Sequence, residues 1–271
     1  MPFQWIAERK VHYELDDFTC PWRSSQVVFI QHGMGRNTNF WRDWPPRLGR
    51  TWRVVRRDLP GHGESEAPPP GTQWRLEDLV AQTIEFLDAM NLDRVHFLGE
   101  STAGMLGVML AATHPERLHS LILCASPTTI SPAAQAFFAG AHADWQTAIR
   151  TLGTGGWARW LANQPGTMGT IEPTQREWVI EQFARIPAHA LVGYSEMISR
   201  TDVSSLLPDI RVPTLVLAPT RSAATPLAQQ EAMAARIPNA RIVVVDGSGH
   251  EIYADQPEVC SAAIREFLSD A

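Results

Sequence analysis

Cysteine is scarce in this 271-residue sequence, and its scarcity excludes two kinds of stabilising site. Cys20, Cys124 and Cys260 are odd in number and far apart, so neither a disulfide framework nor a zinc site is expected. We therefore expect a reduced, cytoplasmic protein that binds no metal. Cys124 ends an apolar run and is interpreted as a small core residue.

The sequence also lacks a cluster of basic side chains and any long apolar run. Asp and Glu number 29 against 23 Lys and Arg, which gives a net charge of -6. Nucleic-acid-binding proteins show the opposite balance, with basic residues gathered in one patch. No apolar stretch is long enough to cross a bilayer, and residues 1–17 lack the features of a signal peptide. We expect no nucleic-acid or membrane partner, but a monomer or homodimer that acts on a small-molecule substrate.

Short apolar runs that alternate with helical patterns are abundant. Residues 2–15 alternate polar and apolar side chains, which predicts an antiparallel hairpin at a sheet edge. Residues 27–30 form a continuous apolar run, typical of a parallel strand buried on both faces. Further short strands are expected at 53–55, 95–98, 121–124, 214–218 and 241–245. This alternation predicts an α/β fold with a mostly parallel, eight-stranded, doubly wound sheet, formed by residues 1–127 and 207–271.

The stretch 128–206 contains no strand-like run and interrupts this alternation. Its pattern predicts about four helices, which we expect to form a cap over the carboxyl edge of the sheet. The glycines of 153–156 follow no strand and precede no lysine, so a helix–helix joint is expected there rather than a phosphate loop. The stretch is rich in tryptophan, and we expect Trp157 and Trp160 to line an apolar substrate pocket.

One turn carries the strongest chemical signal. A buried strand at 95–98 leads directly into an apolar helical run at 105–112, with Ser101 at the corner. Small residues, Gly99 and Ala103, flank the serine and allow the strand and the helix to approach closely. This arrangement is typical of the nucleophile elbow, in which a strained turn presents the serine hydroxyl beside a helix N-terminus.

Three further motifs follow other predicted strands. They are His32-Gly33-x-Gly35, Asp58-x-Pro60-Gly61-His62-Gly63-x-Ser65 and Gly249-His250. With the elbow, they make the sequence resemble the α/β-hydrolase family, in the capped subgroup of small esterases, lactonases and carbon–carbon bond hydrolases. The resemblance covers essentially the whole chain, because the four motifs occur in the family's order and in the same strand context.

The resemblance implies a catalytic site that needs no cofactor. It implies that Ser101 is the nucleophile and His250 its base, a role that suits an imidazole, which titrates near neutral pH. It also implies that the backbone N–H groups of Met34 and Thr102 form the oxyanion hole. Glu100 resembles a buried structural carboxylate of the family, and His32 and His62 are expected to orient loops.

The sequence departs from the family at the catalytic acid. Family members usually carry aspartate after the strand matched here by 214–218, and this chain has Ser222 in that position. The other known position, at 125–128, also offers no carboxylate. The acid is therefore unassigned: either the Ser222 hydroxyl accepts the histidine N–H, or a carboxylate from Asp202, Glu196 or Asp246 takes the place of the aspartate.

The leading interpretation is a serine hydrolase of a small carboxylic ester or lactone. Two alternatives stay open at this point. In the first, the same fold and pocket serve carbon–carbon bond hydrolysis, a lyase reaction or a cyclisation, with Ser101 and His250 positioning groups or transferring protons. In the second, the protein binds a small molecule without catalysis. The intact Ser101 and His250 favour an enzyme, whereas the missing carboxylate favours the alternatives.

Overall fold

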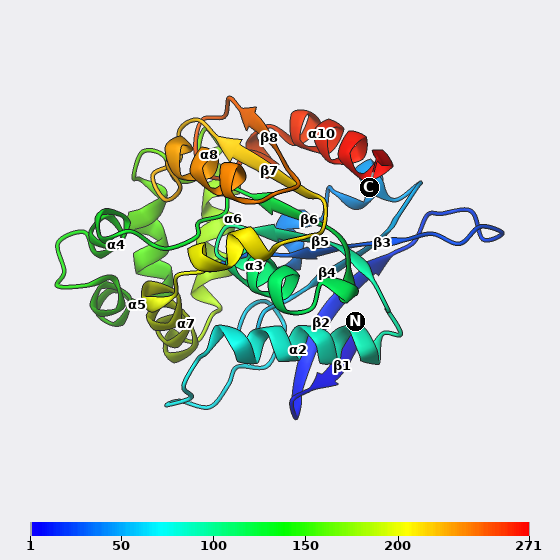
Figure 1. Ribbon diagram of the computed structural model, residues 1–271. Coiled ribbons are helices and arrows are strands. Elements are labelled where there is room, and N and C mark those ends of the chain that lie inside the picture. Colours follow the sequence, from blue (N-terminus) through cyan, green and yellow to red (C-terminus); the bar gives the residue numbers. More distant parts are fainter. Residues whose placement is uncertain (1, 271) are drawn as a thin grey trace.

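A single eight-stranded sheet forms the centre of the molecule in the computed structural model, which describes residues 2–270 (Figure 1). The strand order is β1-β2-β4-β3-β5-β6-β7-β8. Only β1 and β2 run antiparallel to their neighbours. The strands are β1 (Phe3–Ile6), β2 (Arg9–Asp16), β3 (Val27–Gln31), β4 (Arg53–Arg57), β5 (Val95–Glu100), β6 (Leu118–Cys124), β7 (Thr214–Pro219) and β8 (Ala240–Val245). The predicted mostly parallel, eight-stranded α/β sheet is confirmed.

The central strands are apolar because both of their faces are covered. Every residue of β3, β5 and β7 is buried, as expected of parallel strands between two helical layers. Neighbouring residues on β3 belong to different cores: Phe29 packs in one hydrophobic cluster and Val28 in the other. The edge hairpin of β1 and β2 is only partly buried, which explains its alternating sequence.

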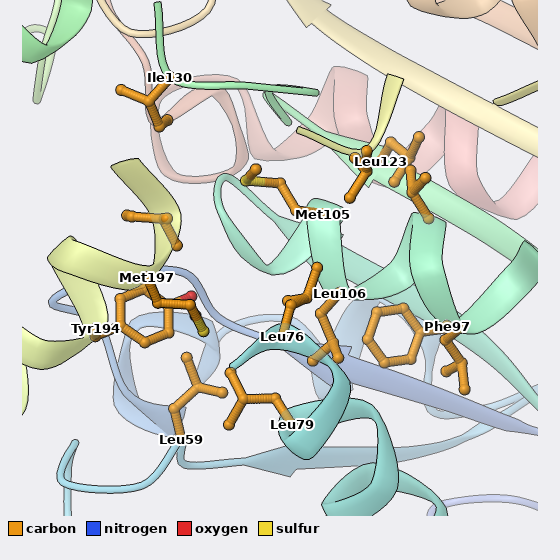
Figure 2. Packing of buried hydrophobic residues seen from close by; sticks show 14 of the residues in the cluster. Leu59, Leu76, Leu79, Phe97, Met105, Leu106, Leu123, Ile130, Tyr194 and Met197 are labelled. Atoms are coloured by element: carbon orange, nitrogen blue, oxygen red, sulfur yellow. The ribbon is translucent and has the colours of Figure 1, made fainter. Parts of the chain in front are cut away.

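Helices complete the two layers that cover the sheet. Figure 2 shows part of the larger cluster, where Leu76 and Leu79 of one helix face Leu106 of another. The helices outside the 128–206 stretch are α1 (Pro45–Leu48), α2 (Leu76–Ala89), α3 (Ala103–Thr113), α8 (Leu227–Arg236), α9 (Ile252–Asp255) and α10 (Pro257–Asp270), with 3-10 turns η1 (Thr38–Trp41) and η2 (Pro115–Arg117). Among residues 2–270, none of the helices combines the length and the apolar character that crossing a membrane requires.

Four helices lie between β6 and β7, and they gather at one end of the sheet (Figure 1). They are α4 (Pro132–Ala139), α5 (Trp145–Ala162), α6 (Pro173–Ala184) and α7 (Ala188–Arg200), followed by the 3-10 turn η3 (Ser204–Asp209). A bridge between Thr129 and Asp202 closes the base of the insertion. Gly153 has φ 70° and ψ 164°, so α5 is broken at the glycine-rich joint.

The inserted helices share the hydrophobic core of the sheet rather than standing apart from it. Tyr194 and Met197 of α7 belong to the same cluster as Leu59, Leu76 and Phe97 (Figure 2). Residues that precede the insertion therefore pack directly against it. That residues 128–206 act as a cap stays a prediction, which we develop below as part of the proposed function.

Candidate active site

Ser101 occupies a strained turn at the carboxyl end of β5. Its φ of 51° lies in the left-handed region, which a non-glycine residue adopts only when its surroundings enforce it. The Ser101 N–H donates to the Cys124 carbonyl at 2.9 Å. A side chain on Gly99 would put its Cβ 2.6 Å from the Ala103 carbonyl, so only glycine allows this close approach of strand and helix. The turn holds Ser101 at the N-terminus of α3.

His250 reaches the serine from the loop after β8. Its Nε2 lies 2.9 Å from Ser101 Oγ, within hydrogen-bond distance. The backbone N–H of His250 donates to the Thr167 carbonyl at 2.7 Å, and Thr167 lies between α5 and α6. The structure therefore brings together the two residues that the sequence singled out, and the insertion helps to hold the histidine loop.

The other ring nitrogen of His250 contacts hydroxyl groups. Ser222 Oγ lies 2.8 Å from Nδ1, and Thr225 Oγ1 lies 3.4 Å from it. Both residues come from the loop between β7 and α8, at the position that the resemblance gives to the acid. Burial, together with the positive charge of Arg36, lowers the pKa of His250 to about 4. Its imidazole is therefore neutral at pH 7.

The three carboxylates considered as replacement acids lie elsewhere on the surface. Glu196 pairs with Arg150 at 2.6 Å, and Asp246 accepts from the Thr220 hydroxyl at 3.0 Å. Asp202 accepts from the Ser204 amide at 2.8 Å. Within residues 2–270, none of these carboxylates is hydrogen-bonded to His250, so the alternative of a carboxylate supplied by one of them does not agree with the structure.

The two amides expected in the oxyanion hole differ in their surroundings. The Met34 N–H donates to Thr102 Oγ1 at 3.0 Å, and this hydroxyl also lies 3.0 Å from the hydroxyl of Tyr194 on α7. The Thr102 N–H has no hydrogen-bond partner within the described part of the chain. An oxyanion bound there would have to share or replace the bond between Met34 and the Thr102 hydroxyl.

A small cavity lies over Ser101 and His250. Its volume is about 70 Å³, and aromatic side chains of the insertion form much of its wall. Trp157 is buried and lines the cavity, and its indole N–H donates to the Phe138 carbonyl at 3.0 Å. Trp160 does not line it but packs over Gly140 and Phe137, so the expectation for Trp160 is wrong. Helical spacing alone did not distinguish these two residues.

Two ionised residues that sequence analysis missed also line the cavity. Arg36 forms an ion pair with Glu251, and both side chains are buried. The Arg36 guanidinium lies over the rings of Phe40 and Phe183, 5.0 and 4.9 Å from their centroids. Each residue follows a recognised motif directly, at Gly35 and at His250, and this proximity was the available signal.

Glu100, His32 and His62 form hydrogen bonds to backbone groups of the loops. Glu100 Oε2 accepts from the Gly33 N–H at 2.7 Å, and burial raises the pKa of this carboxyl. His32 donates from Nδ1 to the Gly33 carbonyl and accepts at Nε2 from the Leu59 N–H. His62 Nδ1 lies 3.0 Å from the Pro60 carbonyl. These contacts agree with the loop-orienting and structural roles expected of the three residues.

Comparison with known proteins identifies the class. A profile of the family described as alpha/beta hydrolase fold matches residues 26–257. Two relatives are 28% identical: a protein named carbamate hydrolase RutD from Caulobacter segnis, aligned over 93% of this chain and 94% of its own, and a pimeloyl-[acyl-carrier protein] methyl ester esterase from Neisseria meningitidis, over 89% and 76%. The crystal structure of an enol-lactonase from Burkholderia xenovorans superimposes with a TM-score of 0.88 at 24% identity, covering 99% of this chain and 100% of that one.

The chain therefore belongs to the alpha/beta hydrolase fold family. It is a hydrolase of this type, because the relatives that match it over most of its length are named as hydrolases. The prediction of an α/β-hydrolase-type enzyme is confirmed, and the interpretation as a binding protein without catalysis loses its support.

Proposed function

We propose that the protein hydrolyses a small carboxylic ester or lactone, with Ser101 as the nucleophile and His250 as its general base. The observation that carries the proposal is the 2.9 Å contact between His250 Nε2 and Ser101 Oγ at a strained elbow beneath a mostly apolar cavity. The names of the relatives support it, because carbamates, methyl esters and enol lactones all present an acyl carbon bearing a heteroatom leaving group.

The proposed reaction has two stages. As Ser101 Oγ attacks the acyl carbon, its proton moves to His250 Nε2 and the carbonyl electron pair moves to oxygen. The N–H groups of Thr102 and Met34, at the N-terminus of α3 and in the glycine loop, would bind this oxyanion. His250 gives the serine proton to the departing leaving group, and the acyl-serine remains. Water then attacks the acyl-serine with His250 as the base once more, and the proton returns to Ser101 Oγ as the acid product leaves.

Labelling of Ser101 tests the reaction class directly. A fluorophosphonate probe should attach to Ser101, and the adduct should appear in the peptide that contains this residue. Ser101→Ala should abolish the adduct, and His250→Ala should slow its formation about 10²-fold or more, the usual contribution of a general base. If folded protein forms no adduct with several such probes, the proposal is wrong.

A second candidate reaction uses the same residues without ester cleavage. The observation in its favour is the hydroxyl group of Ser222 at the acid position, since a neutral partner stabilises an imidazolium less than a carboxylate does. His250 would then transfer a proton in carbon–carbon bond hydrolysis or in a lyase reaction. Rapid fluorophosphonate labelling without turnover of any ester or lactone tested would favour this candidate.

The inserted helices serve as a cap that shapes the acyl pocket. Phe138, Trp145, Trp157 and Phe183 supply much of its apolar wall. The cavity, of about 70 Å³, has room for about five water molecules, so it suits a short acyl group. This role for residues 128–206 also explains why the loop at Thr167 contacts the histidine loop.

A matched pair of tryptophan variants tests the cap. Trp157→Ala enlarges the cavity, so KM for a short-chain ester should rise while longer acyl chains become better substrates. Trp160→Ala removes a tryptophan from the same helix that lies outside the cavity, and its acyl-chain preference should stay that of the parent. Equal changes in both variants would assign the effect to helix packing instead of the pocket.

A further inference from the structure

The Ser222 hydroxyl receives more hydrogen-bond donors than its oxygen has lone pairs. The N–H groups of Ala224 and Thr225 lie 3.2 and 3.0 Å from Ser222 Oγ, and the Thr225 hydroxyl donates to it at 2.9 Å. A hydroxyl oxygen offers two lone pairs and one proton. With three donors already directed at this oxygen, its own proton is the group left for the neighbouring ring nitrogen, 2.8 Å away on His250.

This arrangement has the opposite polarity to one with a carboxylate. A carboxylate only accepts, so it holds the histidine proton on Nδ1 and leaves Nε2 free to take the serine proton. A hydroxyl that donates to Nδ1 instead leaves the ring proton on Nε2, where it faces Ser101 Oγ at 2.9 Å. Thr225 Oγ1, 3.4 Å from Nδ1, is a second hydroxyl beside the same nitrogen.

Building on the proposed function, we propose that Ser222 donates its proton to His250 Nδ1 and that the enzyme consequently selects acyl substrates whose leaving group departs as a stabilised anion, such as aryl and enol esters. In the resting enzyme the Nε2 proton faces the nucleophile. Before His250 can act as a base, its ring proton must move from Nε2 to Nδ1. There the proton faces Ser222 Oγ, which already accepts three hydrogen bonds.

The imidazolium that forms during attack is poorly stabilised from both sides. Its Nδ1–H meets the neutral, fully engaged oxygen of Ser222, and the guanidinium of Arg36 contributes an unfavourable like charge. Two carboxyls lie near that guanidinium, but Glu251 is paired with Arg36 and Glu100 is hydrogen-bonded to the Gly33 amide. A reaction that needs a full proton on His250 before the leaving group departs is therefore slowed the most.

Aryl and enol esters lessen this demand. As Ser101 Oγ bonds to the acyl carbon, its proton moves to His250 Nε2, the carbon–oxygen bond to the leaving group breaks, and that electron pair stays on the departing oxygen. Because the acyl carbon of these esters is more electrophilic, the attack needs less proton transfer to His250 at the transition state. A phenol ionises near pH 10, as tyrosine does, far below water at about 15.7. A phenolate or enolate thus leaves without first receiving a proton, and His250 returns the serine proton to it or to water afterwards.

The tautomer is measured directly by nitrogen NMR of protein labelled at histidine. We expect the His250 signals, assigned with His250→Gln, to show a protonated Nε2 and an unprotonated Nδ1 at pH 7. In Ser222→Asp the proton should move to Nδ1, because a carboxylate can only accept. The loop can accommodate a carboxylate at position 222, since the Ala224 and Thr225 N–H groups already donate to the side-chain oxygen there. A proton on Nδ1 in the parent enzyme overturns the inference, even if the variant does not fold.

Esters with different leaving groups test the expected preference for leaving groups that depart as stabilised anions. For acetate esters of phenols and aliphatic alcohols, each rate is divided by the rate of hydroxide-catalysed hydrolysis. After this correction, we expect phenyl acetate to exceed ethyl acetate by about 10²-fold or more in kcat/KM, the scale of lost proton-transfer catalysis. Ser222→Asp should narrow the ratio about tenfold, whereas Ser222→Asn, equal in size but uncharged, should not.

The outcomes separate this inference from the proposed function. Corrected rates for phenyl and ethyl acetate within tenfold of each other, or equal narrowing by Ser222→Asn and Ser222→Asp, would contradict the leaving-group preference and leave the esterase intact. Failure of Ser101 to react with any ester or fluorophosphonate would remove the proposed function itself.

Discussion

His12 and His250 place Nδ1 at the same distance from an oxygen, but their pKa values shift in opposite directions. His12 on β2 places Nδ1 2.8 Å from Asp58 Oδ2, and His250 Nδ1 lies 2.8 Å from Ser222 Oγ in the candidate site. Burial lowers the pKa of both rings. At His12 the hydrogen bond and charge of Asp58, with a contribution from Glu14, outweigh burial and raise the pKa. At His250 burial prevails and the pKa falls to about 4.

The comparison separates hydrogen-bond geometry from charge. Asp58 and Ser222 both accept two backbone N–H groups in addition to their histidine contact: Asp58 from Thr38 and Glu64, and Ser222 from Ala224 and Thr225. The local frameworks are thus alike. What differs is one negative charge, which the molecule has beside His12 and lacks beside His250.

The largest expected effect comes from removing the two histidines separately. His250→Ala should lower kcat/KM for phenyl acetate about 10³-fold or more, because it removes the base that we propose for the Ser101 proton. His12→Ala should leave kcat/KM within about threefold, because His12 lies away from the cavity. Steady-state rates and melting curves of both variants check this contrast. A large rate loss in His12→Ala would show that the two sites are coupled.

The second effect concerns stability and compares the two oxygen acceptors. Asp58→Ala removes a buried acceptor from His12 and from two backbone amides, and it should lower the free energy of unfolding by about 3–5 kcal/mol. Ser222→Ala removes a neutral acceptor from a half-exposed loop and should cost about 1 kcal/mol. Urea denaturation of both variants gives the two values. Equal losses would mean that charge is not the difference between the two frameworks.

The sequence predicted the parts of the molecule that backbone patterns determine. Continuous apolar runs are typical of strands covered on both faces, and β3, β5 and β7 are entirely buried. The elbow was also predictable, since a strand that leads directly into a helix needs a residue without a side chain at Gly99, where a Cβ would meet the Ala103 carbonyl. The contact between Ser222 and His250 agrees with the position that the resemblance gives to the acid.

The parts that depend on side-chain direction across the chain could not be predicted. Arg36 and Glu251 are 215 positions apart and meet only in the folded cavity wall. Trp157 and Trp160 are three residues apart on one helix, yet only Trp157 lines the cavity, because the rotation of α5 is set by its packing against α4, α6 and α7. The bond between the Met34 amide and the Thr102 hydroxyl likewise has no sequence signature.

The third effect is a pH profile that compares Ser222 with an aspartate as the partner of His250 Nδ1. His250 must be neutral to act as a base, and its pKa is about 4, so kcat/KM should stay level from pH 7 to about 5 and fall only near pH 4. In Ser222→Asp the carboxylate favours the charged ring, so the fall should begin at a pH higher by about one unit or more. Ser222→Asn should keep the parent profile.

Circular dichroism at each pH distinguishes inactivation from unfolding in that experiment. This control matters because burial also lowers the pKa values of His32 and His62, to about 3 and about 4. Folded protein binds fewer protons than unfolded chain between these values and 6.5, so acid alone weakens the fold. A parent profile that already falls near pH 6.5, with the fold intact, would contradict the neutral environment assigned to His250.

The smallest expected effect is a pH-dependent change in the stabilisation that His12 provides. Because the pKa of His12 is raised above its ordinary value of 6.5, folded protein keeps a proton that the unfolded chain releases as the pH rises past 6.5. The stabilisation is complete below pH 6.5 and is lost as the pH rises through the folded pKa. Asp58 and Glu14 both face this ring, so both contribute. The difference in free energy of unfolding between parent and His12→Gln should therefore shrink above pH 6.5, by about 1 kcal/mol, the scale of one hydrogen bond. Urea denaturation at several pH values measures it, and a difference that stays constant or grows would show that Asp58 does not hold the His12 proton.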